Sequence, residues 1–158
     1  MIRWKSKNTR WLDAESNPIS MNYILDSLCN NNSYEIHVGC DSHKIGNQYV
    51  FAVVIAGYIQ RRGGTFFFHR KRSKDIQLSN MKVRLMKEVE LALDIARQIE
   101  GHFPERRITV HLDLNPKPEF ASYRVLSSAV SWVRSCGYDT LVKPNAWASS
   151  SLADSFAK

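Results

Sequence analysis

Apolar and polar residues alternate along the first half of this chain. Ile36, Val38 and Cys40 fall on one side of a short segment, and His37, Gly39 and Asp41 fall on the other, as in a half-buried strand. Two more β-rich segments follow, and Arg61-Arg62-Gly63-Gly64 between them is a hairpin turn signal. We predict a three-stranded antiparallel meander over residues 34–41, 49–59 and 65–71.

Helical spacing dominates elsewhere. Ser20 is a candidate cap for a first helix that ends at Asn30-Asn31-Asn32, and Ser79 for a long helix over residues 80–100. We predict further helices over 119–136 and 149–157, with strands at 107–114 and 139–143. Residues 1–33 then form an arm and helix, irregular up to residue 19 with Trp4 and Trp11 as anchors. Residues 34–158 form an α/β domain with a mixed sheet.

Composition narrows the class of protein. The 158 residues include 22 Lys and Arg against 15 Asp and Glu, which gives a net charge of +7 and favours a polyanionic partner. The longest apolar run, residues 49–59, is too short to cross a membrane, and no secretory signal follows Met1. Three cysteines without CxxC spacing predict free thiols in a reducing cytosol, so we expect a cytoplasmic protein.

Four acidic residues stand out by position. Asp41 and Asp113 end two strands that would bring them together if the strands are parallel neighbours, and Glu88 falls inside the apolar stripe of the long helix. Asp154 lies on the terminal helix. Taken singly, each has a plainer explanation: a turn-forming Asp, a Glu88–Arg84 pair, or a solvated helix residue.

Clustered carboxylates repel one another unless a proton or cation lies between them. Their oxygens are hard ligands that suit Mg²⁺ or Mn²⁺. Two such ions would activate a water and stabilise the leaving oxygen of a phosphodiester. The acidic cluster and the basic chain therefore point to the same type of partner.

Several segments, in order, resemble the ribonuclease H-like superfamily and within it the YkuK-like group of bacteria and phages. The resemblance covers roughly residues 34–157. It is carried by Ile36–His43, the Arg84–Ala96 helix with Glu88-Val89, Val110–Pro116, Val142–Ser150 and Ala153-Asp154.

The resemblance implies an RNase H-like fold with a five-stranded mixed sheet in the order 3-2-1-4-5, flanked by helices. It implies that Asp41, Glu88, Asp113 and Asp154 are the catalytic, metal-binding carboxylates of a two-ion nuclease site. Cys40 stands where the group usually has Thr, and Asn145 where it has Asp. RNA–DNA hybrid specificity does not follow, since fold alone does not fix a substrate.

Candidate nucleic-acid contacts are less specific. His43 could position water or phosphate, or be a turn residue, and Lys143 could contact phosphate or be solvated. Trp147 could stack on a base or pack the terminal helix. Arg61 and Arg62, with Arg70-Lys71-Arg72 and Lys74, could form a phosphate track or a solvated rim. For His37 and His111 we expect packed positions rather than metal ligation.

The leading hypothesis is a nuclease that hydrolyses DNA or RNA with two Mg²⁺ or Mn²⁺ ions. The alternatives are a non-catalytic nucleic-acid or protein-binding module that retains the fold, and a junction resolvase acting as a dimer. We expect a nucleic-acid partner and no membrane. The sequence leaves substrate type, cleavage mode and oligomeric state open.

Overall fold

One sheet runs through the chain. The computed structural model describes residues 10–158, and in them the sheet has seven strands in the order β2-β1-β5-β4-β3-β6-β7. The predicted five strands keep their predicted order within it, but the predicted total is wrong. The strands are β1 (Trp11–Leu12), β2 (Pro18–Ile19), β3 (Glu35–Ile45), β4 (Gln48–Ile59), β5 (Gly63–Ser73), β6 (Ile108–His111) and β7 (Asp139–Leu141).

The two additional strands come from the arm that was predicted to be irregular. Leu12 of β1 pairs with Phe68 of β5, so β1 adds to the edge of the meander. Trp11 is buried, and its ring meets the ring of His69 edge-on with centroids 4.4 Å apart. Two-residue strands have no readable alternation, so only the tertiary pairing could reveal them. Trp4 lies outside the described residues.

Acid should weaken the fold through His69, which is 1% exposed and lacks a hydrogen-bond partner for either ring nitrogen among residues 10–158. Burial, with the charge of Lys71, lowers its pKa from 6.5 to about 3. The unfolded chain therefore takes up a proton first, and stability is lost as pH falls from 6.5 toward 3. Urea titrations measure the free energy of unfolding of His69→Leu and of the unmodified protein. We expect the difference between them to rise in favour of His69→Leu by about 1–3 kcal/mol as the pH falls from 6.5 to 4. His102→Leu, at an exposed position, should show no such trend; parallel curves for His69→Leu would contradict the prediction.

The helices follow most of the predicted boundaries. Ser20 caps α1 (Met21–Cys29) as predicted, since its Oγ accepts from the Tyr23 N–H. The cap of α2 (Met81–Ile99) is Asn80 rather than Ser79, because Ser79 closes the preceding turn η1 (Ile76–Ser79). The remaining elements are η2 (Glu100–His102), α3 (Tyr123–Ser135), the π-helical turn η3 (Ala148–Ala153) and α4 (Asp154–Ala157).

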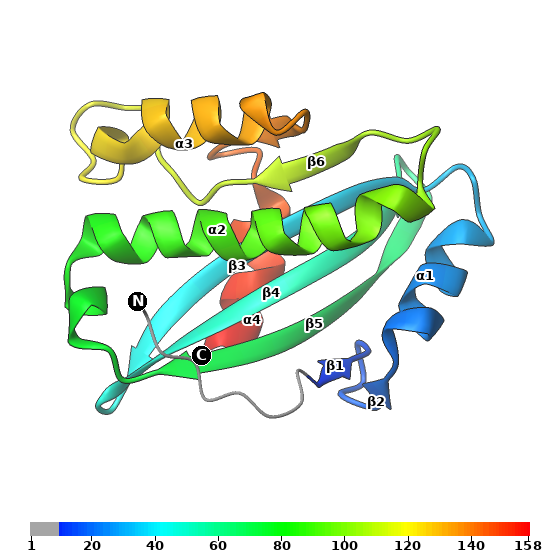
Figure 1. The fold of residues 1–158 in the computed structure, drawn as a ribbon, viewed down its shortest axis with the longest axis horizontal. Helices are drawn as coiled ribbons and strands as arrows, with labels where there is room; N and C mark the ends of the chain where they lie inside the picture. Colours follow the sequence, from blue (N-terminus) through cyan, green and yellow to red (C-terminus); the bar gives the residue numbers. More distant parts are fainter. Residues whose placement is uncertain (1–9) are drawn as a thin grey trace.

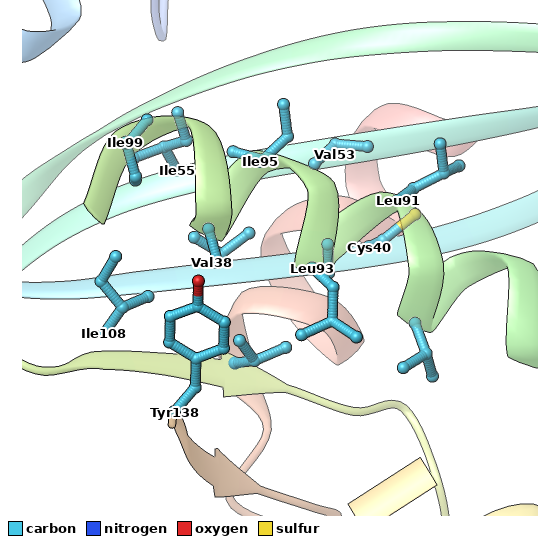
Figure 2. Packing of buried hydrophobic residues seen from close by; sticks show 14 of the residues in the cluster. Val38, Cys40, Val53, Ile55, Leu91, Leu93, Ile95, Ile99, Ile108 and Tyr138 are labelled. Carbon is cyan, nitrogen blue, oxygen red and sulfur yellow. The ribbon is translucent and has the colours of Figure 1, made fainter. Parts of the chain in front are cut away.

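The helices cover both faces of the sheet. Figure 1 shows α2 crossing one face of β3 and β4, with α4 on the opposite face. The larger core lies under α1, α2 and α3; Figure 2 shows Leu91 and Ile95 of α2 over Val38, Cys40 and Val53. The smaller core lies under η3 and α4, where Phe156 stacks on Phe68 at 3.8 Å. None of the helices within residues 10–158 has the length and apolar character needed to cross a membrane.

Gly39 lets η3 lie directly on β3. A Cβ added at this position would lie 2.6 Å from the carbonyl carbon of Ala148 and 2.7 Å from the Ser149 nitrogen, both backbone atoms. The contact fixes the distance between the sheet and the segment that leads into α4. Glycine is therefore required at Gly39 by a close backbone approach.

Gly39→Ala should destabilise the protein by about 1–3 kcal/mol, because η3 must shift to admit the methyl group. Urea-unfolding midpoints measure this loss. Gly101→Ala is the matched control, since a Cβ there meets nothing within 4 Å. Equal stability of the two variants would contradict the close approach.

Candidate active site

Two aspartates meet where β6 ends beside β3. These strands are parallel, and Gly39 pairs with His111, so Asp41 and Asp113 each lie two residues further along. The predicted parallel pairing is confirmed. Asp41 does not end its strand as predicted, because β3 continues to Ile45 in its pairing with β4. Asp113 follows the end of β6, so β3 projects beyond its neighbour at the site.

Glu88 reaches the site from α2. It is only 6% exposed on the helix face that packs against the sheet. Ser42 Oγ donates a hydrogen bond of 2.5 Å to Glu88 Oε1. Arg84 does not form the close pair with Glu88 that was the plainer explanation of this residue. Instead it donates a hydrogen bond to the Leu78 carbonyl and lies over the Tyr49 ring.

Burial and neighbouring carboxylates disfavour the charged forms of Asp41 and Glu88. Burial and the charge of Asp113 raise the pKa of Asp41 from 3.8 to about 7. Burial and the charge of Asp41 raise the pKa of Glu88 well above its usual range, with a smaller contribution from Asp113. This arrangement favours any cation placed between the carboxylates, since a proton or metal relieves their repulsion.

Asp154 and His43 complete the cluster on the α4 side. His43 Nε2 lies 2.7 Å from Asp154 Oδ1 and 3.5 Å from Asp41 Oδ2. Lys158 Nζ, one helical turn beyond Asp154, lies 3.0 Å from its second oxygen. Partial burial raises the pKa of Asp154, but hydrogen bonds from His43 and Lys158 outweigh it, so the pKa lies below its usual value.

Asp113 has a cationic neighbour of its own. Lys143 Nζ lies 3.0 Å from Asp113 Oδ1, without the alignment of a hydrogen bond. Lys143 follows β7, and its backbone N–H donates to the Leu114 carbonyl, which places the ammonium group beside the site. Lys143 therefore lies where a phosphate bound at the carboxylates would be within reach.

Donor atoms are closest together on one side of this site. Ligand atoms of Asp41, His43 and Asp154 all lie within 4.8 Å of one another. Glu88 and Asp113 are outside this group and are linked to Asp41 by charge. The structure thus gathers the other three predicted carboxylates, Glu88, Asp113 and Asp154, around Asp41, and it adds the imidazole of His43.

The candidate nucleic-acid residues separate into two places. His43 and Lys143 lie at the carboxylates. Arg61 and Arg62 lie at the hairpin between β4 and β5. Near this hairpin, Tyr58 of β4 pairs with Glu35 of β3, which is six residues, or about 20 Å, along β3 from Asp41. Trp147 lies at the same end of the sheet. It lines a groove of about 260 Å³ together with Tyr58, Phe66 and Leu152.

Trp147 also packs against two buried histidines. Its ring lies 4.8 Å from the rings of both His37 and His111. His111 Nδ1 accepts from the Ala148 N–H, so the 2.9 Å contact runs from His111 Nε2–H to His37 Nδ1. Both histidines are buried, as expected for packed positions, and burial holds the pKa of His111 at about 3.

Other basic residues come closer to the site than Arg61 and Arg62. Asp41 pairs with Ala52, which pairs with Arg70, and His43 pairs with Val50, which pairs with Arg72. Directly paired residues share a sheet face, so Arg70 and Arg72 lie on the Asp41 face, two strands or about 10 Å away. The sequence grouped both sets of arginines in one rim, and the register separates them.

Sequence reasoning missed two residues that position the carboxylates. Ser42 bonds to Glu88, and Lys158 bonds to Asp154. Lys158 had a readable signal, since a lysine four residues after an acid on a helix commonly pairs with it. Ser42 had none, because its partner lies 46 residues away.

The sheet begins with an antiparallel meander and continues with the parallel pair β3 and β6, and the carboxylates lie where these two strands meet. These features define a class of α/β proteins with an acidic site beside the central strand. A family model described as ribonuclease H-like matches residues 21–158. The chain belongs to this ribonuclease H-like family. No curated protein matches the chain.

Proposed function

We propose that this protein is a divalent-metal-dependent nuclease that hydrolyses phosphodiester bonds in DNA or RNA. The observation that carries the proposal is the junction of β3, β6 and α2, where burial and the charge of Asp113 raise the pKa of Asp41, and burial and the charge of Asp41 raise the pKa of Glu88. Membership of the ribonuclease H-like family and a net charge of +7 support a nucleic-acid partner.

The residues present fit two Mg²⁺ or Mn²⁺ ions. All four carboxylates supply hard oxygen donors, and the buried Asp113 Oδ1 accepts no aligned hydrogen bond from any residue within 10–158. Asp41, Glu88, Asp113 and Asp154 would hold the ions. When bound, such ions activate a water for attack on phosphorus and stabilise the departing oxygen.

The remaining chemistry belongs to side chains around the carboxylates. Ser42 orients Glu88 through its hydrogen bond, and Lys158 orients Asp154. Lys143 pairs with Asp113 and would offer its ammonium group to an incoming phosphate. Arg70 and Arg72 would hold the backbone of the substrate next to the site.

The test is a cleavage assay on single- and double-stranded DNA, RNA, RNA–DNA hybrid and a branched junction, with Mn²⁺ or Mg²⁺. We expect cleavage of at least one substrate, loss of it in EDTA and loss of it in Asp41→Asn. Cleavage that survives both EDTA and Asp41→Asn would overturn the proposal, as would no cleavage of any substrate. Mass in solution tests the dimer that a junction resolvase would need.

A second candidate function is a binding module without catalysis. Three contacts favour it, because each gives a carboxylate a partner other than a metal: Ser42 donates a hydrogen bond to Glu88, the Lys143 ammonium group lies beside Asp113, and His43 pairs with Asp154. Such a module would bind nucleic acid with a steep salt dependence that EDTA does not change. Cleavage that EDTA abolishes would rule it out.

The register also yields a prediction about the substrate-binding face. Arg72→Gln should weaken nucleic-acid binding and reduce the slope of log affinity against log salt by about 1, because one phosphate contact is lost. Arg62→Gln, at the far end of the sheet, is the matched comparison. Fluorescence anisotropy across a salt series measures both. An effect confined to Arg62→Gln would mean that the substrate binds at the hairpin between β4 and β5 and not beside the carboxylates.

Membership of the YkuK-like group is part of this proposal. It rests on the ordered segments from Ile36–His43 to Val142–Ser150. The structure brings the carboxylates of these segments to one place, which supports a common site. It leaves the choice between DNA and RNA to the assay.

A further inference from the structure

His43 is the one nitrogen donor in the tightest ligand cluster of the described residues. We propose that Asp41, His43 and Asp154 form a metal site in which His43 Nε2 is a direct ligand, and that this makes the site selective for Mn²⁺ over Mg²⁺. The inference rests on the proposed function for its biological purpose, but the site is argued from geometry alone.

The spacing of the donor atoms suits an octahedral ion. Neighbouring ligands of an ion held at about 2.1 Å lie about 3.0 Å apart. The two separations from His43 Nε2, 2.7 Å to Asp154 and 3.5 Å to Asp41, lie on either side of this value. Small movements of side chains would therefore admit an ion.

The cluster is held in place by packing. Asp41 and His43 lie on β3, and each is paired with a residue of the neighbouring strand β4. Asp154 begins α4, which is anchored by Phe156 stacking on Phe68 and by a hydrogen bond from Arg70 Nε to the Phe156 carbonyl. Three ligands from two packed elements make a defined site.

The buried charge calls for a cation at this position. The Asp41 side chain is only 10% exposed, and the Asp154 side chain is 31% exposed. In the metal-free protein His43 lies between the two and donates to Asp154. Asp41, Asp154 and His43 Nε2 would hold a metal ion together, and His43 would then need to be in the neutral form with its proton on Nδ1.

The imidazole sets the preference between ions. Mg²⁺ takes oxygen ligands almost exclusively and keeps much of its water. First-row transition ions accept imidazole readily, and Mn²⁺ is the member of that series that carboxylates also suit. A site with two carboxylates and one imidazole therefore favours Mn²⁺.

Pulsed electron paramagnetic resonance of the Mn²⁺-loaded full chain tests this directly, because a coordinated imidazole gives a ¹⁴N coupling. We expect that coupling in the unmodified protein and its absence in His43→Asn. His102→Asn, which changes an exposed histidine outside the site, should retain it. His43 is one-third exposed, so its replacement should leave the fold intact, which circular dichroism verifies.

Calorimetric titration supplies the second readout. Losing even an outer-shell partner of a metal commonly costs 10–100-fold in affinity. We therefore expect Mn²⁺ affinity to fall at least about tenfold in His43→Asn, with a smaller change for Mg²⁺. An Mn²⁺-loaded protein without nitrogen coupling would overturn the inference, and so would a rise in Mn²⁺ affinity in His43→Asn, which would mean that His43 competes with the ion.

The outcome is separable from that of the proposed function. Nitrogen coupling in a protein that cleaves no substrate would support the metal site and reject the nuclease. Metal-dependent cleavage without nitrogen coupling would support the nuclease and reject His43 as a ligand.

Discussion

Asp41→Asn is expected to abolish metal-dependent cleavage and, in the absence of metal, to stabilise the fold. Asp41 would be a metal ligand, and without metal its charged form is disfavoured, since burial and the charge of Asp113 raise its pKa from 3.8 to about 7. Removing its charge relieves repulsion that the metal-free protein must otherwise bear. Loss of this metal ligand should lower the cleavage rate at least about 100-fold.

The stability gain has a defined pH dependence. A group whose pKa is raised on folding favours the protonated, folded state at low pH, and that stability is lost as pH rises from 3.8 through about 7. The difference corresponds to a ceiling of about 4 kcal/mol. We expect Asp41→Asn to gain about 1–3 kcal/mol at pH 8 and almost nothing at pH 4.

Urea unfolding in EDTA at the two pH values measures this gain. Asp94→Asn is the matched control: Asp94 is an exposed α2 residue beside Arg97, and its change should stay within about 0.5 kcal/mol. A destabilised Asp41→Asn at pH 8 would show that the carboxylate makes contacts worth more than the repulsion it suffers.

Mn²⁺ binding is expected to weaken by about tenfold for each pH unit below 7. The ion binds the deprotonated carboxylate, so protons compete with it below the pKa of Asp41. Glu88, whose pKa is raised by burial and by Asp41, adds to the dependence. Above pH 7 to 8 the affinity contributed by Asp41 should level off.

Calorimetric titrations with Mn²⁺ from pH 5.5 to 8 give the slope. Asp41→Asn supplies the control, since it removes the titrating group and should bind weakly with a shallower slope. A pH-independent affinity in the unmodified protein would show that the ion binds away from Asp41.

The central fold could be predicted because its signals are local. Alternation over residues 34–41 predicted β3, although the strand continues to Ile45, and the apolar stripe around Val89 predicted α2 within one residue of its observed bounds. The parallel pairing of β3 with β6 came from the family resemblance, and the register confirms it. The edge strands β1 and β2 were missed, because strands of two residues, one pairing with β5 and the other with β1, leave no periodic trace.

The site was predictable in its acids and unpredictable in its surroundings. Glu88 was found because a carboxylate on an apolar stripe is conspicuous, and its burial is confirmed. Its bond to Ser42 and the tight grouping of His43 with Asp154 depend on residues 46 and 111 positions apart. No spacing in the chain encodes such contacts.

The sequence by itself determined which side chains are charged, which faces of β3 and α2 are apolar, and hence that acids would be buried within a basic chain. Only the tertiary structure decided which of these acids share a cluster and which arginines lie beside it. The reason is that periodicity fixes the direction of a side chain relative to its own element, whereas the contacts of Gly39 with Ala148, and of His43 with Asp154, depend on how closely separate elements approach.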